Sequence, residues 1–451
     1  MSTELTDPAQ LRRVFIHSLG CQMNEYDAGK IRAQLARDGW VSTTEPGEAD
    51  LIVVNTCSVR EKAVDKMHSA LGEYRRMKRS GQRVMIGIAG CVAQERGADL
   101  AAKYPDVDLV FGPDGVPQVR QLVAKAATGQ RVLDTEFLDL EGYPFVSDLD
   151  PAATGVSAFV TIQKGCDNHC TFCIVPSTRG AEASRPSVEI VDEVRAYAAR
   201  GVKEIVLIGQ NVNSYGLKVP GQPTFAQLLY AVADVPGVER IRYTTSHPRD
   251  MGADVVQAYR DLPQLCSHLH LPVQSGSNRV LRRMKRYYTR ERYLELVEAL
   301  RDARPDLVLS TDVIAGFPGE TDEDFAETLD LAERVGFVGS FSFKYSPRPG
   351  TPALKLEERD PVPDAVASAR LTAYQDRQRE RSLAWHRSFE GREVSVLVEG
   401  PSAHDEGVVC GRTSDHAMIN FVGPESLVGS TVTVACTRGF THSVRGERVG
   451  D

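Results

Sequence analysis

The sequence has no run of apolar residues near the ~20 that a membrane-spanning helix requires. Its opening stretch, MSTELTDPAQLRR, also lacks the apolar segment of a secretory signal peptide. The chain carries no excess of positive charge, and its formal net charge of -8 does not indicate a nucleic-acid-binding protein. No internal repeat or low-complexity segment is present. These absences predict a cytoplasmic protein without membrane contact.

The nine cysteines are an odd number in a chain of 451 residues. Without an export signal, this argues against a disulfide framework and favours thiolate ligands or reactive thiols. The length predicts roughly two to four domains. Any RNA contact has to come from local basic clusters such as Tyr74–Arg79 and Arg282–Arg286, although such runs are more often solvated helix faces.

Short apolar runs alternate with helical patterns over residues 12–132. The runs VFIHSLGC, DLIVVNTC and VMIGIAGC are predicted strands, and helices are expected around Lys30–Asp38 and Val64–Arg79. This alternation predicts an open parallel α/β sheet. The polar stretch Glu141–Gly155 that follows is predicted to be a linker.

Six further strand patterns lie within residues 152–383, namely SAFVTIQ, KEIVLIG, RIRYTT, SHLHLP, LVLSTDVIAG and FVGSFSF. Helical patterns separate them, so the region contains two β/α units fewer than a closed (β/α)₈ barrel. We therefore expect an open, partial (β/α)₆ barrel, with its chemistry at the C-terminal ends of the strands.

A charged helical pattern leads into a different arrangement at residues 386–449. The runs REVSVLVEG, EGVVCGRT, HAMINFVG and STVTVACT are short strand patterns with glycine-rich turns. They predict a small all-β barrel of the oligonucleotide-binding type. From His386 to Asp451 there are six Lys and Arg residues and nine Asp and Glu residues, a net charge of -3 that is weak for phosphate binding.

Three cysteines, Cys166, Cys170 and Cys173, follow the predicted strand SAFVTIQ at the mouth of the expected barrel. A 4Fe-4S cluster takes one ligand per iron, so Cys-x₃-Cys-x₂-Cys supplies three ligands and leaves one iron open. An open iron can chelate S-adenosylmethionine, and an electron from the cluster can cleave it to a 5′-deoxyadenosyl radical. This spacing, with Phe172 before the last cysteine, is the signature of the radical S-adenosylmethionine superfamily. The alternative is a zinc site completed by His169 or a distant cysteine.

A second trio, Cys21, Cys57 and Cys91, is too widely spaced for a linear motif. A lone cysteine near a strand is most often a buried small hydrophobe. Each of these three, however, follows a predicted strand after the same short turn, SLGC, VNTC or IAGC. If the strands are parallel, all three thiols emerge at one edge of the sheet, where ligand sites form. We predict a second, incompletely ligated cluster there, with Gly20 and Gly90 letting the backbone wrap closely around it.

Polar residues near the predicted ends of barrel strands are the candidates for binding S-adenosylmethionine: Gln210, Ser246, Gln274 and Asp312. A hydrogen-bonding role at the barrel rim is an equally good interpretation of each, because polar groups at barrel mouths serve both purposes.

Over essentially its full length the sequence resembles the methylthiotransferases, a family of radical S-adenosylmethionine enzymes. The resemblance is specific at GCQMNEYD and NTCSVREKA, and it extends to SHPRD, HLPVQSGS, DVIAGFPGET and YSPRPGTPA. Gln22–Asn24 and Ser58–Glu61 resemble the branch that acts on tRNA. Leu19 is more usual in the branch that acts on a ribosomal protein, and Tyr287 stands where a small residue is usual.

The resemblance implies two 4Fe-4S clusters, S-adenosylmethionine as both radical source and methyl donor, and a C-terminal RNA-binding barrel of the TRAM type. The implied substrate is isopentenyladenosine next to the anticodon of a tRNA, where sulfur and then a methyl group are added at C2 of the base. A base in a single-stranded loop can be splayed out into a pocket. The implied partners are this anticodon stem-loop and an electron donor such as flavodoxin or ferredoxin, and we expect a monomer whose sulfur donor is left open.

Two other functions stay open at this point. One is a methylthiotransferase that modifies an aspartate of a ribosomal protein. The other is a non-catalytic RNA-binding protein that carries an iron–sulfur cluster or zinc. This function explains least, because it gives the open iron of the predicted cluster no role.

Overall fold

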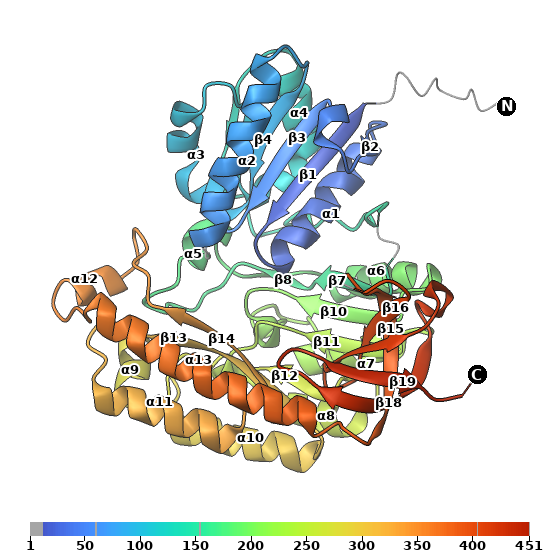
Figure 1. Cartoon of the computed structure of the whole chain (residues 1–451). Helices are drawn as coiled ribbons and strands as arrows, with labels where there is room; N and C mark the ends of the chain where they lie inside the picture. Colours follow the sequence, from blue (N-terminus) through green and yellow to red (C-terminus); the bar gives the residue numbers. More distant parts are fainter. Residues whose placement is uncertain (1–11, 59–60, 153–154, 404, 451) are drawn as a thin grey trace. The chain divides into compact units, whose positions relative to one another are not determined.

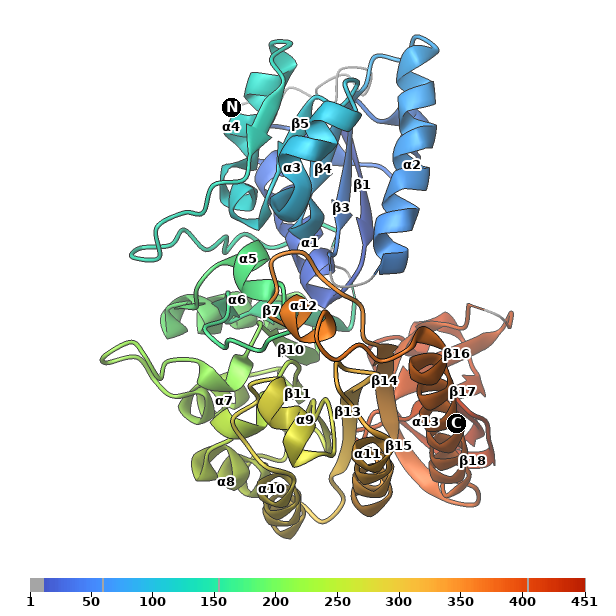
Figure 2. The ribbon, with the colours of Figure 1, turned by 90° about the vertical axis from the view of Figure 1, so that its left-hand side faces the viewer.

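The computed structural model describes residues 12–58, 61–152, 155–403 and 405–450. Some residues used in the sequence predictions lie outside this part. They are residues 1–11 of the opening stretch, Val59 and Arg60 of the tRNA-type motif, and Ala153 and Thr154 of the predicted linker. The chain divides into two compact units, which Figures 1 and 2 show from two directions. The first unit comprises the described residues of Met1–Thr154 with Gln163–Asp167 and Ile174–Arg185, and the second comprises Gly155–Ile162, Asn168–Cys173 and the described residues of Pro186–Asp451.

The first unit is built on a six-stranded parallel sheet in the order β2-β1-β3-β4-β5-β6. Its strands are β1 (Arg13–Leu19), β2 (Val41–Ser42), β3 (Leu51–Thr56), β4 (Met85–Ala89), β5 (Leu109–Phe111) and β6 (Val132–Asp134). The helices between them are α1 (Gln22–Ala36), α2 (Glu61–Arg79), α3 (Cys91–Lys103) and α4 (Val119–Ala127). The predicted open parallel α/β sheet is confirmed.

Both faces of this sheet are covered, which explains why β3 is apolar along almost its whole length. Ile52 and Val54 pack with residues of α2 and α3 on one face. Leu51 and Val53 pack with residues of α1 and α4 on the other. Figure 2 shows α2 and α3 beside the strands they cover. A strand buried on both sides needs a continuous apolar run rather than alternation.

The second unit contains six parallel strands in two hydrogen-bonded groups, β11-β10-β7 and β12-β13-β14. These are β7 (Ser157–Thr161), β10 (Glu204–Ile208), β11 (Arg240–Tyr243), β12 (His268–His270), β13 (Val308–Ala315) and β14 (Gly339–Lys344). A parallel bridge between Ile241 and Leu265 links the two groups. Within the described residues β7 and β14 each pair with one neighbouring strand, so the predicted open barrel of six strands is confirmed.

Helices alternate with these strands. They are α6 (Ser187–Ala199), α7 (Phe225–Ala233), α8 (Ala253–Asp261), α9 (Asn278–Arg283), α10 (Arg290–Ala303), α11 (Asp322–Val335), α12 (Ala353–Glu357) and α13 (Asp364–Arg387). Three further short elements, β8 (Gln163–Lys164), α5 (Val175–Arg179) and β9 (Ala183–Ser184), belong to the first unit. In the part of the chain that is described, no helix is long and apolar enough to cross a bilayer.

The C-terminal part of the second unit is a closed five-stranded barrel in the order β15-β16-β17-β19-β18. Its strands are β15 (Glu393–Pro401), β16 (Val408–Arg412), β17 (Met418–Val422), β18 (Thr431–Gly439) and β19 (Val444–Arg448). The predicted small barrel is confirmed, but the sequence showed only four of its strands. β19, with the sequence VRGER, buries only Val444 and Gly446, so its polar residues concealed a strand that pairs with both β17 and β18.

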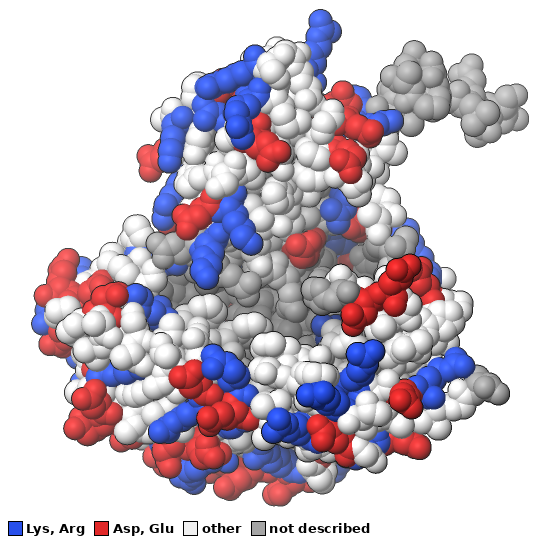
Figure 3. Space-filling model, in the orientation of Figure 1, with Lys and Arg blue, Asp and Glu red and all other residues white. Residues whose placement is uncertain are grey.

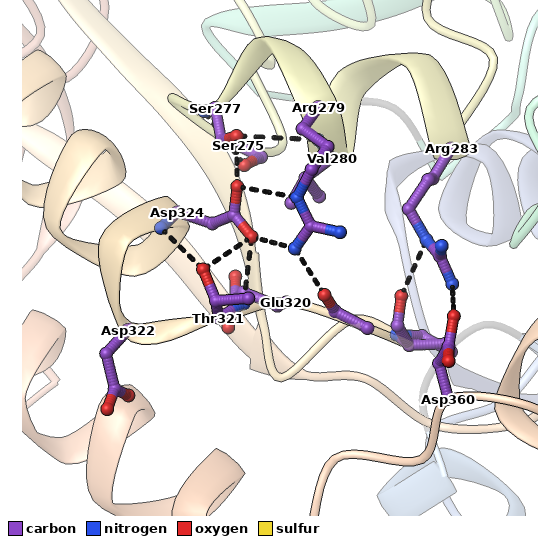
Figure 4. Close-up of polar contacts among 12 residues, drawn as sticks. Ser275, Ser277, Arg279, Val280, Arg283, Glu320, Thr321, Asp322, Asp324 and Asp360 are labelled. Atoms are coloured by element: carbon purple, nitrogen blue, oxygen red, sulfur yellow. Dashed lines mark hydrogen bonds and ion pairs between the residues drawn. The ribbon is translucent and has the colours of Figure 1, made fainter.

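A cluster of polar side chains joins the first turns of α9 and α11 (Figure 4). Ser277, which caps α9, donates a hydrogen bond of 2.6 Å to Asp324 Oδ1. Thr321 caps α11, and its amide donates to Asp324 Oδ2 at 2.8 Å. Arg279 forms an ion pair with the same carboxylate. Although burial opposes the charge, the hydrogen bonds from Arg279, Ser277 and Thr321 lower the pKa of Asp324 to about 2.

This depressed pKa predicts acid-sensitive stability. A carboxylate with a pKa of about 2 in the folded chain and ~3.9 in the unfolded chain stabilises the fold fully above about pH 4 and loses its contribution as the pH falls through about 2. We expect Asp324→Asn to destabilise the protein by about 1–3 kcal/mol at neutral pH, because charged hydrogen bonds are lost. The difference should shrink in acid, as measured by thermal denaturation of both proteins from about pH 7 to about pH 3.

Asp330→Asn is a matched control in the same helix, because Asp330 is 61% exposed in its ion pair with Arg290. Exposed pairs contribute little, so this variant should melt close to wild type at every pH. A gap between Asp324→Asn and wild type that stays constant down to about pH 3 would contradict the prediction.

Candidate functional site

The three cysteines of the first unit leave its sheet at one edge. Cys21 stands two residues beyond β1, Cys57 one residue beyond β3 and Cys91 two residues beyond β4. Strand β3 pairs in parallel with both β1 and β4, so the three strand ends are neighbours. Cys21 caps α1 and Cys91 is the first residue of α3. Helix N-termini favour negative charge, which suits thiolates at these two positions.

Two asparagines with no exposed surface tie the turns of this edge together. Asn24 Nδ2 donates to Asn55 Oδ1 at 3.2 Å, and Asn55 Nδ2 donates to the carbonyl oxygen of Asn24 at 2.8 Å. Asn24 Oδ1 also accepts from the amide of Cys21 at 3.3 Å and from its Sγ at 3.1 Å. These bonds explain why α1 begins at Gln22, before the predicted helix around Lys30–Asp38.

The predicted glycines are needed here for close packing within the protein. A Cβ atom at Gly20, with φ 152°, would stand 2.4 Å from Cys57 Cβ. A Cβ atom at Gly90, with φ 89°, would stand 2.4 Å from Asn55 Oδ1. Real Cβ contacts are longer than 3 Å, so both positions exclude side chains. The glycines therefore bring the three turns together, and their role in letting the backbone wrap around a cluster stays a prediction.

A buried arginine stands beside these cysteines. Arg179, the last residue of α5, donates to Asp27 Oδ2 at 2.6 Å, and its positive charge favours the thiolate form of Cys91. Burial lowers the pKa of Arg179, but Asp27 and the Cys91 and Cys21 thiolates together raise it well above its usual value. The guanidinium therefore stays charged and can offset the negative charge that thiolate ligands bring.

The thiols of the trio differ in how easily they ionise. A hydrogen bond with Cys57, assisted by Arg179 against the effect of burial, lowers the pKa of Cys21 to about 6. Burial raises the pKa of Cys91 in spite of Arg179. Among the described residues, no three His, Cys, Asp or Glu side chains already surround a metal position. The role of these cysteines as ligands therefore stays a prediction, supported by their place at one edge.

Cys166, the first cysteine of the Cys-x₃-Cys-x₂-Cys segment, belongs to the first unit. Its amide donates to the carbonyl oxygen of Gly180 at 3.1 Å, directly after Arg179. Gly165 has φ 73°, and a Cβ there would stand 1.9 Å from the carbonyl oxygen of Ala181. The backbone of Cys166 is thus held by the segment that contains Arg179, the arginine whose charge acts on Cys21 and Cys91.

Cys170 and Cys173 belong to the second unit, where the Cys173 amide donates to the carbonyl oxygen of Cys170 at 3.1 Å. Phe172 meets Phe317 edge to face, with ring centroids 6.4 Å apart, so the half-buried aromatic residue of the signature packs against a cluster of buried residues. Arg286 Nη1 donates to Cys170 Sγ at 3.4 Å. A cation therefore also stands beside the second cysteine of this segment.

The four candidates for S-adenosylmethionine binding lie in the second unit, three just beyond strand ends and one within β13. Gln210 follows β10, and Ser246, only 4% exposed, follows β11 with an Oγ that has no hydrogen-bond partner among the described residues. Gln274 follows β12 with φ 71°, and its backbone N–H donates to the backbone carbonyl oxygen of Asp312 at 2.8 Å. The Asp312 carboxylate stands 3.3 Å from His270 Nε2. A buried hydroxyl without a partner costs about 1–3 kcal/mol, which fits a ligand contact at Ser246.

Comparison with curated proteins reveals relatives that match almost the whole chain. The tRNA-2-methylthio-N(6)-dimethylallyladenosine synthase of Geobacter metallireducens is 46% identical over 437 residues, which cover 96% of this chain and 98% of the relative. The synthase of Syntrophus aciditrophicus is 43% identical, covering 97% and 94%, and that of Thiobacillus denitrificans is 46% identical, covering 97% and 98%. The chain belongs to the tRNA-2-methylthio-N(6)-dimethylallyladenosine synthase family. The predicted resemblance is thereby confirmed.

Family models agree with this membership. The Radical SAM superfamily matches residues 160–332, the TRAM domain matches residues 387–449, and the model described as "Uncharacterized protein family UPF0004" matches residues 13–112. The chain is therefore a radical S-adenosylmethionine enzyme, and the interpretation as a non-catalytic protein is not supported.

Solved structures show the same fold at low sequence identity. The radical S-adenosylmethionine methyltransferase TsrM from Kitasatospora setae, with cobalamin and a [4Fe-4S] cluster bound, has a TM-score of 0.58 at 15% identity and covers 78% of each chain. The cobalamin-dependent S-adenosylmethionine radical enzyme OxsB has a TM-score of 0.53 at 13% identity, covering 82% of this chain and 62% of that chain. At these identities the likeness concerns the fold alone.

The two basic clusters of this chain are less available to RNA than their sequence suggests. Figure 3 shows Lys and Arg side chains over α2, but three of the four basic residues within Tyr74–Arg79 form ion pairs with Asp106 or Asp108. Within Arg282–Arg286, Arg286 is buried and Arg283 pairs with Asp360. Most of these charges already have a partner inside the protein.

Sequence analysis missed the residues that support the cysteines. Asn24 and Asp27 lie within the motif GCQMNEYD, and Arg179 lies within STRG at the end of the three-cysteine segment. Their presence in these motifs was the available signal. Their roles depend on contacts between residues more than 100 positions apart, such as Arg179 with Asp27 and Arg286 with Cys170.

Proposed function

We propose that this chain adds a methylthio group to C2 of isopentenyladenosine next to the anticodon of a tRNA. Support comes from the identity of 43–46% to synthases named for this reaction, over nearly the whole chain. The observation that carries the proposal is the gathering of Cys21, Cys57 and Cys91 at one sheet edge beside a buried guanidinium. Radical cleavage alone needs only one cluster, whereas this edge offers thiolates for a second.

In this proposal the two trios hold two 4Fe-4S clusters, the radical cluster at Cys166, Cys170 and Cys173. All six cysteines are thiols rather than disulfides, as ligation requires. When bound, the clusters and S-adenosylmethionine supply the one-electron cleavage, the sulfur atom and the methyl group needed to replace an unactivated aromatic C–H bond. Arg179 offsets the charge of one trio and Arg286 that of the other.

In this proposal, side chains at the barrel mouth bind and orient S-adenosylmethionine. The Ser246 hydroxyl, which has no hydrogen-bond partner in the described part of the chain, offers a hydrogen bond to S-adenosylmethionine. Gln210 and Gln274 follow the strands β10 and β12, and Asp312 lies within β13. His270 holds the Asp312 carboxylate in place. We assign residues 12–132 to the domain with the second cluster, residues 152–383 to the radical domain and residues 386–449 to the TRAM barrel.

The partners follow from the same chemistry. The tRNA anticodon stem-loop is the substrate, and a flavodoxin or ferredoxin is the proposed electron donor because its potential reaches the low range of such clusters. We further propose that the enzyme works in the cytoplasm as a monomer, with the sulfur donor left open. Because residues 386–451 carry a net charge of -3, recognition of the flipped base in a pocket has to supply much of the discrimination.

The isopentenyl group provides the test of this function. A five-carbon chain at ~0.8 kcal/mol per buried CH₂ is worth about 4 kcal/mol, and half of that corresponds to ~30-fold in rate. We expect tRNA without the isopentenyl group to be methylthiolated at least ~30-fold more slowly than prenylated tRNA of the same sequence. Mass spectrometry of nucleosides from single-turnover reactions measures both rates.

Equal rates on the two tRNAs would count against the assignment. Faster methylthiolation of a ribosomal-protein peptide containing the target aspartate would support the other branch of the family instead. The two outcomes are separated by running the peptide and the two tRNAs with one preparation of reconstituted enzyme.

A further inference from the structure

Among the residues that the structure describes, Arg286 is a buried cation without a carboxylate partner. It is 6% exposed, and its guanidinium donates to Cys170 Sγ at 3.4 Å, to the carbonyl oxygen of Pro272 at 3.1 Å and to Tyr288 Oη at 3.2 Å. Within residues 12–58, 61–152, 155–403 and 405–450, no Asp or Glu side chain forms an ion pair with it. Burying a charge without a counter-charge costs several kcal/mol, so this position calls for an anion.

Neighbouring arginines show what is missing at Arg286. Arg279 pairs with Asp324 and Arg283 pairs with Asp360, and both pairs are drawn in Figure 4. These two residues lie on α9, just before Arg286, and both are more exposed than it is. The most buried of the three cations is therefore the one that has only neutral oxygens and a cysteine sulfur as partners.

The backbone around Arg286 is held in an unfavourable conformation. Lys285 has φ 55° and Tyr287 has φ 57°, so non-glycine residues in the left-handed region flank it on both sides. Such conformations are unfavourable for residues with a side chain and persist where the surroundings require them. The left-handed φ also explains why a small residue suits position 287. The chain accepts this strain in a turn that aims one guanidinium at Cys170.

We propose that Arg286 is the counter-charge of the radical cluster, a positioning residue that hydrogen-bonds the Cys170 thiolate, keeps it on its iron and raises the reduction potential. This inference rests on the proposed function, because it takes Cys170 as a ligand. Three thiolates give a 4Fe-4S cluster a negative net charge, and one more electron adds to it. A fixed cation and an N–H···S bond favour the reduced state, since net charge and hydrogen bonds to sulfur set the potential.

The test measures the potential of this cluster alone. In full-length protein carrying Cys21→Ala, Cys57→Ala and Cys91→Ala, only the radical cluster remains. Each sample is titrated with dithionite, which supplies one electron per cluster, and the reduced fraction is followed by electron paramagnetic resonance. Arg286→Gln removes the charge but keeps hydrogen-bonding groups for Pro272 and Tyr288, and Arg286→Lys keeps the charge.

We expect Arg286→Gln to lower the ratio of reduced to oxidised cluster at least tenfold at a given potential, which is a shift of 59 mV for one electron. Arg286→Lys should recover most of this ratio. Arg283→Met is the matched control, because Arg283 is a nearby arginine with its own carboxylate, Asp360, and it should leave the potential unchanged. An unchanged potential in Arg286→Gln overturns the inference. If the potential is unchanged but S-adenosylmethionine binds more weakly, Arg286 pairs with the carboxylate of that cofactor instead.

A second measurement needs no variant at position 286 and covers the case in which Arg286→Gln fails to fold. In protein labelled with ¹⁵N-arginine, pulsed electron paramagnetic resonance should detect ¹⁵N coupled to the reduced radical cluster, and absence of coupling contradicts the inference. The function is tested separately by the unsubstituted protein. If that protein binds no iron and cleaves no S-adenosylmethionine, the proposed function fails, whereas normal cleavage with an unchanged potential in Arg286→Gln refutes only the role of Arg286.

Discussion

Alanine at Cys166, Cys170 or Cys173 is expected to reduce the reductive cleavage of S-adenosylmethionine to the level of a protein-free control. The cluster of the proposed function loses a thiolate that no neighbouring side chain supplies. The fold should survive, because the contacts that anchor Cys166 and Cys173 are made by their backbone amides. The measurement is the yield of 5′-deoxyadenosine with dithionite as reductant, together with circular dichroism to confirm folding.

Cys410→Ala serves as the control for this series. Cys410 is a half-buried thiol of β16, outside both trios, and its replacement should leave the yield of 5′-deoxyadenosine at the wild-type level. Wild-type yield from any one of the three variants would remove that cysteine from the site. Loss of yield in Cys410→Ala would show that general damage to thiols, rather than ligation, explains the results.

Alanine at Cys21, Cys57 or Cys91 should abolish methylthiolation of tRNA but leave the cleavage of S-adenosylmethionine intact. We expect 5′-deoxyadenosine to form as in wild type, while methylthiolated nucleoside falls below detection, because the second cluster carries the sulfur in the proposed function. Replacing all three should lower iron per chain by about half, as for the loss of one of two clusters. Iron analysis and mass spectrometry of tRNA nucleosides measure the two effects on the same preparations.

An unchanged iron content in the triple variant would mean that these cysteines are only packed core residues. Loss of 5′-deoxyadenosine along with the product would also contradict the prediction, because it would place the trio in the radical step. Asn24→Ala provides a useful comparison. It keeps all three thiols and the bond from Asn55 to the Asn24 carbonyl oxygen but removes the side-chain bonds of Asn24 with Cys21 and Asn55, so it should weaken iron retention without abolishing it.

The sheet edge of the first trio could be predicted because it depends on local patterns. Each of β1, β3 and β4 is an apolar run followed by a short turn and a cysteine, and parallel pairing then places the thiols together. The barrel strands were predictable for the same reason. β19 was not, because its sequence is polar and its strand conformation comes from pairing with β17 and β18.

The roles of the buried arginines Arg286 and Arg179 could not be predicted, because the sequence does not distinguish a buried charged residue from an exposed one. The run Arg282–Arg286 has the pattern of a solvated basic face, yet it ends in a buried guanidinium against Cys170. Arg179 likewise gives no local sign that it pairs with Asp27, 152 positions away. Only the fold decides which members of a basic run enter the interior.

The composition of the first unit also has a consequence for the order of events during synthesis. Cys21, Cys57 and Cys91 leave the ribosome early, whereas Arg179, whose charge favours the thiolate forms of Cys21 and Cys91 in the finished unit, follows about 90 residues later. At ~5–20 residues per second this interval lasts about 4–18 seconds. During that time the nascent chain carries all three thiols and an Asp27 without its partner. The growing protein therefore passes through a stage in which the cysteine edge can form before its covering cation has been translated.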